Sequence, residues 1–150
     1  MSDPKEFYTL KGYQAQEAGD MTAAMEDYLE MICRLLKQSA VVRIGELAAK
    51  LNVSPPSVSK MITHLNATGY IHAQKYGYIV LTEKGRKAGD YLLYRHAVLQ
   101  RFLCVLNQSD NELEQVEKIE HFLNKQTIEN LNALTKRLET EGKGKGKGKV

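Results

Sequence analysis

The sequence lacks any hydrophobic run that approaches the ~20 residues needed to cross a bilayer, and its first residues lack the basic and then apolar pattern of a secretion signal. We therefore expect a cytoplasmic protein with no membrane-spanning segment. Cysteine is scarce as well. Cys33 and Cys104 each lie in an apolar helical pattern, with no second cysteine nearby. This placement favours two small buried hydrophobic residues over metal ligands or disulfide partners.

Catalytic motifs are also absent from the sequence. The chain has no nucleophile placed beside a base, no phosphate-binding glycine loop and no arrangement typical of an oxyanion hole. A dinuclear carboxylate site can perform redox or hydrolytic chemistry, so an enzyme is the alternative from another class. Four-helix di-iron enzymes, however, use paired Glu-x-x-His motifs, and only one comparable patch occurs here. We expect neither catalysis nor a small organic substrate.

Charge is unevenly distributed behind the net value of +3. Residues 40–96 hold eight Lys or Arg against three acids, whereas residues 1–39 and 97–142 each have a balance of −3. Such a basic middle between acidic flanks is typical of a protein whose middle meets a polyanion and whose flanks hold cations or form contacts.

The middle of the chain has the element order of a winged helix-turn-helix. Residues 44–51 predict a short helix, and a turn over 52–54 leads to a second helix over 54–65 whose prolines are tolerated only in its first turn. Residues 70–74 and 78–81 then alternate as strands, which predicts a two-stranded wing. The first turn of the second helix normally reads base edges. We therefore expect DNA contacts from Ser54, Pro55, Pro56, Ser57, Ser59, Lys60, His64, Lys75 and Tyr76.

Helical patterns flank this unit on both sides. One runs from Thr22 to about residue 38, and another runs from Thr82 to at least His96 and as far as Asn107, which is too long for one small domain. Helices over 111–123 and 126–138 follow, and their apolar faces cannot all be covered within this half. That surplus of apolar surface favours a homodimer.

Possible metal ligands lie on the helices next to the junction between these halves. In Glu117-Lys118-Ile119-Glu120-His121, helical periodicity puts two carboxylates and one imidazole on one face. Asp27 and Glu30 lie one turn apart, and His96 lies in the long helix. Taken alone, the acidic pairs are explained by solvated helix faces and His96 by a cap or a hydrogen bond, which leaves a metal-independent winged-helix repressor as an alternative. Their shared position favours a divalent-metal site made of Asp27, Glu30, His96, Glu117, Glu120 and His121.

The chemistry of this set narrows the choice of metal. Four carboxylates and two imidazoles, with no thiolate or thioether, suit Mn(II) or Fe(II). Four negative charges balance two divalent cations when the histidines are neutral, which is consistent with a carboxylate-bridged pair of ions. Affinity should fall as the histidines become protonated below a pH of ~6.5.

The sequence resembles the manganese-responsive branch of the diphtheria-toxin-repressor-like metalloregulators. The resemblance covers residues 22 to about 138, and the order and separation of its motifs match as well. These motifs are Met25-Glu26-Asp27-Tyr28-Leu29-Glu30, Ser54-Pro55-Pro56-Ser57-Val58-Ser59-Lys60-Met61, Leu81-Thr82-Glu83-Lys84-Gly85, Tyr94-Arg95-His96 and Val116-Glu117-Lys118-Ile119-Glu120-His121.

The resemblance implies a homodimer in which the six residues bind two Mn(II) per subunit, with Glu30 and Glu120 as bridges. The iron-responsive branch has a methionine at the position of Asp27 and a cysteine at that of Glu120, so the carboxylates here favour manganese. Fe(II), in an iron-responsive regulator of the same architecture, is the alternative. The implied function is manganese-dependent repression of metal-uptake genes at a palindromic operator in double-stranded DNA.

We therefore predict a mainly α protein with an N-terminal winged helix-turn-helix, joined by a long helix to an all-helical metal-binding and dimerisation domain. The predicted divisions are an N-terminal arm over 1–21, the winged helix-turn-helix over 22–95, the helical domain over 96–140 and a flexible Lys/Gly tail over 141–150.

Overall fold

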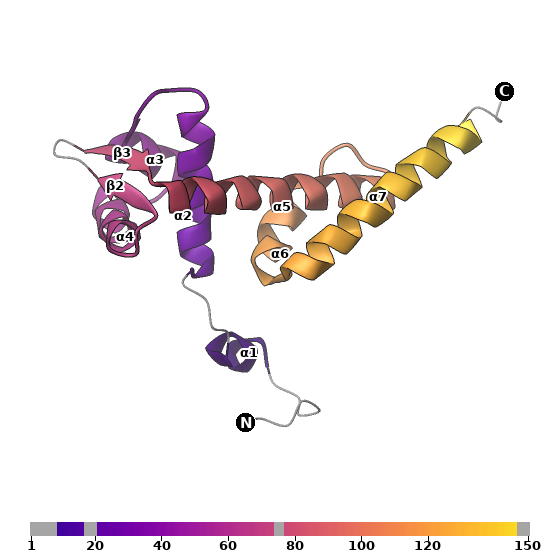
Figure 1. Ribbon diagram of the computed structural model, residues 1–150, viewed down its shortest axis with the longest axis horizontal. Helices are drawn as coiled ribbons and strands as arrows, with labels where there is room; N and C mark the ends of the chain where they lie inside the picture. Colours follow the sequence, from indigo (N-terminus) through magenta and orange to yellow (C-terminus); the bar gives the residue numbers. More distant parts are fainter. Residues whose placement is uncertain (1–8, 17–20, 74–76, 147–150) are drawn as a thin grey trace.

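The computed structural model describes residues 9–16, 21–73 and 77–146, and it is mainly helical (Figure 1). Within these ranges, no helix has the length and apolar character required to span a membrane. The predicted N-terminal arm contains one described helix, α1 (Leu10–Gln16). The remainder of the arm, apart from Thr9 and Met21, lies outside the described residues.

Helix α2 (Ala23–Leu36) begins where its sequence predicts. The side chain of Thr22 accepts a hydrogen bond from the backbone N–H of Met25 at 3.2 Å, which satisfies one of the unpaired donors of the first turn. The apolar side of the helix is buried in the core of the N-terminal half, and Leu29 and Ile32 are fully buried there. This core fixes α2 to the elements that follow.

The predicted helix-turn-helix consists of α3 (Ile44–Leu51) and α4 (Pro55–Ala67). Asn52 makes the turn between them with a φ of 55°, the left-handed conformation that asparagine tolerates better than most residues. Ser54 caps α4 by accepting a hydrogen bond from the backbone N–H of Ser57, and both prolines lie in the first turn.

The wing is the hairpin of β2 (Ile71–Ala73) and β3 (Tyr78–Leu81), as predicted. A third strand, β1 (Val42–Arg43), pairs with the other edge of β3, so that the antiparallel sheet has the order β1-β3-β2. The prediction of only two strands is therefore incomplete. Two residues are too few to show the alternation by which a strand is recognised in a sequence.

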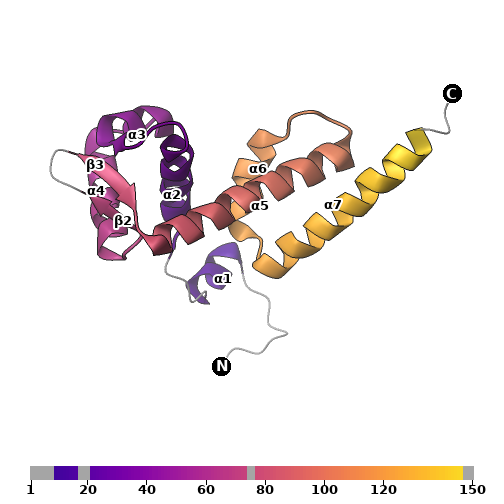
Figure 2. The same ribbon diagram turned by 45° about the horizontal axis from the view of Figure 1, so that its top comes forward.

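Helix α5 (Glu83–Asn107) joins the two halves (Figures 1 and 2). It begins after its cap, Thr82, contacts α2 near its start and reaches α7 near its end. A second core, formed by Val98, Leu99, Leu103, Val116 and Ile128, surrounds its C-terminal part. The 25 residues of α5 therefore belong to both cores, as its length predicts.

The single helix predicted over 111–123 is wrong. Helix α6 (Leu113–Ile119) ends after two turns, and a 3-10 turn, η1 (Glu120–Phe122), follows it. Leu123 is extended with φ −96° and ψ 133°, because the chain must turn back toward the start of α7. A 3-10 turn winds more tightly than an α-helix, so the side chains after Ile119 leave the face predicted from a period of 3.6.

Helix α7 (Lys125–Gly146) is longer than the predicted 126–138. Residues 141–146, which the prediction assigns to a flexible tail, continue this helix, and residues 147–150 lie outside the described residues. Extending an existing helix fixes one residue for each hydrogen bond gained, which offsets the low helix propensity of the alternating glycines, so this extension needs no apolar pattern.

Both cysteines are free thiols. Cys33 is buried in the first core, as predicted, and burial raises the pKa of its thiol to about 11. Cys104 is only half-buried, so the prediction that both would be buried holds for one of the two.

Candidate metal centre

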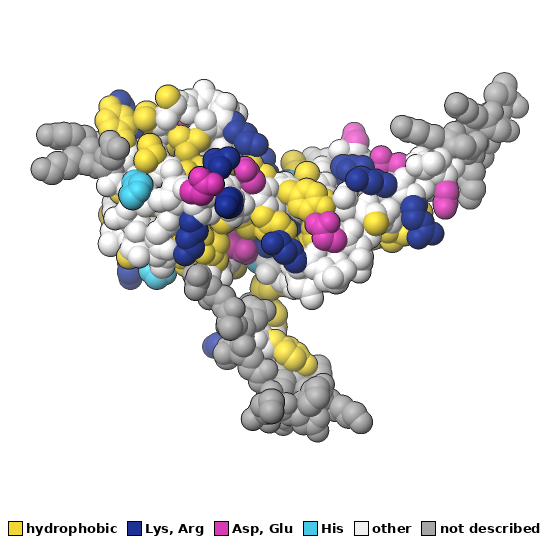
Figure 3. Space-filling view, in the orientation of Figure 1, with side chains coloured by type: hydrophobic (Ala, Val, Ile, Leu, Met, Phe, Trp, Pro, Cys, Tyr) yellow, Lys and Arg dark blue, Asp and Glu magenta, His cyan; other side chains and the backbone are white. Residues whose placement is uncertain are grey.

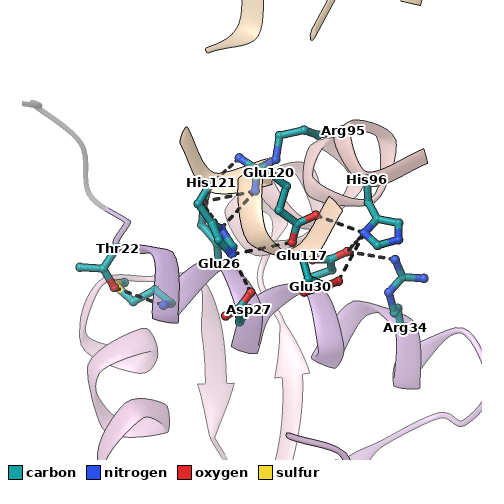
Figure 4. A network of polar contacts seen from close by, with 11 residues as sticks. Thr22, Glu26, Asp27, Glu30, Arg34, Arg95, His96, Glu117, Glu120 and His121 are labelled. Carbon is teal, nitrogen blue, oxygen red and sulfur yellow. Dashed lines mark hydrogen bonds and ion pairs between the residues drawn. The ribbon is translucent and has the colours of Figure 1, made fainter. Parts of the chain in front are cut away.

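Four segments of the chain bring the six predicted ligands together (Figure 4). Helix α2 supplies Asp27 and Glu30 from the N-terminal half, and α5 supplies His96. The other three, Glu117, Glu120 and His121, come from α6 and η1. The centre therefore lies where α2 of the winged half meets the C-terminal half.

The first group of possible ligands comprises Glu30, His96, Glu117 and Glu120, each offering one atom within 4.8 Å of the others. The Nδ1 atom of His96 lies 3.1 Å from Oε2 of Glu120, 3.4 Å from Oε1 of Glu30 and 3.5 Å from Oε1 of Glu117. Three of these side chains are largely buried, whereas that of Glu117 is 55% exposed. The group is thus closed on the inside and open to solvent at Glu117.

The second group comprises Asp27, Glu120 and His121, whose ligand atoms also lie within 4.8 Å of one another. The Nε2 atom of His121 lies 2.8 Å from Oδ1 of Asp27 and 3.8 Å from Oε1 of Glu120. Glu120 belongs to both groups through its two oxygens. Glu30 belongs only to the first group. The resemblance implies that Glu30 and Glu120 both bridge two metal ions, and of these two residues only Glu120 lies in both groups.

Glu120 also provides a test of whether a cation fits this centre. Its side chain is completely buried, and its Oε1 atom has no hydrogen-bond partner within the described part of the chain. An unpaired buried carboxylate oxygen is costly to leave unsatisfied unless a positive charge lies near it. Oxygen and imidazole nitrogen donors in this number suit a divalent cation of the manganese type. The residues therefore fit a metal site.

Glu30 and Glu117 of the first group hold their protons more tightly than ordinary carboxylates. Burial, together with the nearby negative charge of Glu120, raises the pKa of Glu30 to about 7. Burial also raises the pKa of Glu117, again with a contribution from Glu120. Without a cation, the cluster thus relieves its repulsion by binding protons.

The surroundings of both histidines favour the charged form of the ring. Hydrogen bonds to Asp27 and Glu26 raise the pKa of His121 to about 10. A hydrogen bond to Glu120 raises the pKa of His96, against the opposing effect of burial. Both rings must lose a proton before they can bind a metal, so metal binding at this centre releases protons.

Three charged residues beside the centre were not among the predicted ligands. Arg95, whose side chain is 4% exposed, contacts Glu26 with Nη1–Oε2 and Nη2–Oε1 distances of 3.2 and 3.4 Å. Arg34 donates to Oε1 of Glu30 at 2.9 Å. The sequence signals were weak but present, since Glu26 directly precedes Asp27 and Arg95 directly precedes His96.

The predicted DNA-contacting residues on α4 and at its cap lie at the surface of the protein. All those on this helix and at its cap are exposed, namely Ser54, Pro55, Pro56, Ser57, Ser59, Lys60 and His64. Part of this surface borders a shallow cavity of about 440 Å³, lined by Ser57, Lys60, Met61, Thr63, His64 and Ala67. Lys75 and Tyr76, predicted at the tip of the wing, lie outside the described residues. On the face drawn in Figure 3, Lys and Arg side chains are scattered over both halves.

Comparison with known proteins identifies both halves. Residues 20–79 match the family described as iron dependent repressor, N-terminal DNA binding domain. Residues 82–147 match iron dependent repressor, metal binding and dimerisation domain. The chain is also 37% identical over 121 residues to the HTH-type transcriptional regulator MntR of Geobacillus kaustophilus, covering 80% of this chain and 86% of that protein.

Solved structures of similar fold include manganese regulators. The manganese regulator SloR matches with a TM-score of 0.65 and 30% identity over 76% of this chain, and the metal-dependent transcriptional regulator MtsR matches with a TM-score of 0.64 and 28% identity over 76%. The match covers 54% of each of those chains, so this chain spans about half the length of these two proteins.

Proposed function

The chain belongs to the iron-dependent repressor family, and we propose that it is a cytoplasmic, manganese-dependent transcriptional repressor of metal-uptake genes rather than an enzyme. The observation that carries this proposal is the pair of ligand groups that share Glu120 at the junction of α2, α5 and η1. A metal-dependent contact at this point would join the DNA-binding half to the half that matches the dimerisation domain. The similarity to MntR and to the manganese regulator SloR supports the assignment to manganese.

The ligand set supports two Mn(II) ions per subunit. Together the two groups contain all six residues, and Glu120 belongs to both. None of the six has a sulfur atom. Carboxylates at Asp27 and Glu120 occupy the positions where the resemblance gives the iron-responsive branch a methionine and a cysteine. We propose that this difference selects manganese over iron.

In the proposed mechanism, the residues of the metal centre link the DNA-binding half to the C-terminal half. Asp27 and Glu30 belong to α2, which packs in the same core as α3 and α4. His96, Glu117, Glu120 and His121 belong to the other half or to the connecting helix. Manganese, when bound, would supply the positive charge that lets these carboxylates approach without protons. The position of α4 is thereby fixed relative to the C-terminal half.

On DNA, we propose that a homodimer places two copies of α4 in successive major grooves, ~34 Å apart, of a palindromic operator. In each copy, residues 22–95 would serve as the DNA-binding unit and residues 96–140 as the metal-binding and dimerisation unit. Ser54, Pro55, Pro56, Ser57, Ser59 and Lys60 would contact bases, and His64 would lie near the DNA phosphates. Lys75 and Tyr76 would also contact DNA.

An iron-responsive regulator of the same architecture is the second candidate, and the description of the matching family favours it. The two candidates differ in the metal that the centre prefers. Replacing Asp27 by methionine should weaken activation by Mn(II) and strengthen activation by Fe(II) under anaerobic conditions. If activation by Mn(II) is unchanged in this variant, Asp27 does not determine selectivity.

The proposal is tested by fluorescence anisotropy of the protein on DNA from upstream of its own gene or of a manganese-uptake gene. We expect binding with Mn(II) and its loss on addition of chelator. The Glu120→Ala variant should not respond to Mn(II), whereas the matched control Glu114→Gln, an exposed acid on α6 paired with Lys118, should respond normally. Equal binding with metal and with chelator would contradict the proposal.

A further inference from the structure

Glu26 and Arg95 form a charged pair, buried at Arg95 and partly buried at Glu26, that directly adjoins His121 but belongs to neither ligand group (Figure 4). The side chain of Arg95 is 4% exposed and that of Glu26 is 17% exposed. Oε1 of Glu26 lies 2.9 Å from Nδ1 of His121, on the side of the ring opposite the contact of Nε2 with Asp27. The two ring nitrogens therefore face different partners.

Two partners compete for Nδ1 of His121. Arg95 approaches it with Nη2 at 3.4 Å, and Glu26 approaches it at 2.9 Å. A guanidinium can only donate, so a bond from Arg95 would require a bare Nδ1 and would place the ring hydrogen on Nε2. A carboxylate can only accept, so a bond to Glu26 requires the hydrogen on Nδ1. The shorter distance and the charged acceptor favour Glu26.

We propose that Glu26 is a positioning residue for the metal centre: it accepts the Nδ1 hydrogen of His121 and thereby leaves Nε2 as the nitrogen that binds metal beside Asp27 and Glu120. Arg95 holds Glu26 in place through its two contacts. Partners of this kind on the second nitrogen of a metal-binding histidine fix the tautomer and the ring orientation. The inference rests on the proposed function, because it concerns the same centre.

The test compares wild type with Glu26→Gln. A glutamine amide can donate to Nδ1 as well as accept from it, so it no longer imposes one tautomer. We expect Mn(II) affinity, measured by electron paramagnetic resonance of the free ion, to fall by ~10 to 100-fold. Glu114→Gln is the matched control and should bind as wild type, because Glu114 is 86% exposed and lies in neither group.

A second variant separates positioning from simple folding. Glu26→Gln alone leaves Arg95 buried without its partner, so the measurement is repeated on Glu26→Gln with Arg95→Met, which removes both charges together. We expect the melting temperature without metal to recover toward that of wild type in this double variant while the loss of Mn(II) affinity persists. Recovery of affinity along with stability would show a merely structural pair and would overturn the proposal.

A spectroscopic reading of the ring completes the test. In protein with ¹⁵N-labelled histidine and bound ¹¹³Cd(II), we expect His121 to carry its hydrogen on Nδ1 and to show cadmium coupling at Nε2. In Glu26→Gln, this signature should be lost or mixed. An unchanged signature together with weakened binding would make Glu26 a ligand itself and overturn the proposal. Wild type that binds neither Mn(II) nor Cd(II) would overturn the proposed function as well.

Discussion

At the scale of single residues, Glu120 combines complete burial with an oxygen that has no hydrogen-bond partner in the described part of the chain. A side chain selected only for stability would not be placed in this way, because the second oxygen gains nothing from burial. Glu120 belongs to both ligand groups, so its burial is explained by a role in metal binding. Stability without metal and affinity for metal should therefore respond differently when this carboxylate is changed.

Replacing Glu120 by glutamine tests this difference. We expect Mn(II) affinity to fall by more than the ~10 to 100-fold typical of losing an outer partner, since both groups lose a ligand. The free energy of unfolding without metal should stay within ~1 kcal/mol of wild type. The substitution removes the negative charge of Glu120, and with it the repulsion that contributes to the raised pKa of Glu30. Urea unfolding with chelator and Mn(II) titration measure the two quantities. A large loss of stability without metal would contradict this interpretation.

The raised pKa values predict how stability depends on pH. The native protein without metal binds protons more tightly than the unfolded chain at Glu30, with a pKa of about 7, and at His121, with a pKa of about 10. Its stability therefore falls as pH rises between the ordinary pKa of each group and its pKa in the native protein. This range runs from 4.5 to about 7 for Glu30 and from 6.5 to about 10 for His121. Metal binding displaces these protons, so Mn(II) affinity rises over the same range.

Differential scanning fluorimetry from about pH 6 to about pH 8.5 checks this prediction. The melting temperature with chelator should fall with pH, and the increase caused by Mn(II) should grow. His121→Gln should reduce both trends, because a glutamine amide does not titrate. An increase caused by Mn(II) that is constant over this range would show that binding releases no protons.

At the scale of helices, the contact between α2 and α5 depends on glycine. A Cβ atom added at Gly89 would overlap Sγ of Cys33, and one added at Gly85 would overlap the carbonyl oxygen of Tyr70. These two glycines interrupt an otherwise helical sequence, and the structure supplies the reason, which is the close approach of α5 to its neighbours. Since α2 and α5 both carry ligands, we expect this close approach to affect the distance between the ligands on α2 and His96 on α5.

Gly89→Ala should destabilise the protein by ~1 to 3 kcal/mol, because the added methyl group overpacks the contact with Cys33. The matched control is Gly45→Ala on α3, where an added Cβ meets nothing within 4 Å, and it should be neutral or stabilising by up to ~1 kcal/mol. Urea unfolding followed by circular dichroism measures both.

Adding Cys33→Ala to Gly89→Ala identifies the contact responsible. Removal of the sulfur should recover part of the lost stability, so the two changes should be non-additive. Strict additivity would mean that the strain at Gly89 arises elsewhere.

At the scale of the whole molecule, apolar side chains remain exposed on the C-terminal half. Leu106 near the end of α5 and Leu113 at the start of α6 are 58% and 45% exposed. Figure 3 shows hydrophobic side chains at the surface of this half as well as of the winged half. Because residues 82–147 match a dimerisation domain, a second copy of the chain is the partner expected to cover such side chains.

Replacing Leu106 and Leu113 together by glutamate should weaken the dimer, because dimerisation would bury two new charges. Sedimentation equilibrium should show a larger monomer fraction than for wild type at the same concentration. Val53→Glu, which changes a 37% exposed residue of the winged half, is the control and should leave the dimer intact. A double variant that is as dimeric as wild type would place the interface elsewhere on the C-terminal half.

Local sequence was sufficient for the features that depend on neighbouring residues. Thr22, Ser54 and Thr82 cap helices through backbone groups three residues away, so the starts of α2, α4 and α5 could be predicted from local pattern. The order of helices and wing followed in the same way. The residue types at the junction also indicated a hard divalent metal before any distance was known.

Packing in three dimensions was needed for the features that depend on residues far apart in the chain. Glu26 and Arg95 are separated by 69 positions, so no periodic pattern could pair them. The turn η1 arises where the chain must reverse toward α7, and it gives Glu120 a place in both ligand groups that a continuous helix would not predict. Helical periodicity specifies which residues share a face, whereas packing between helices specifies which oxygen of a carboxylate meets which nitrogen of a ring.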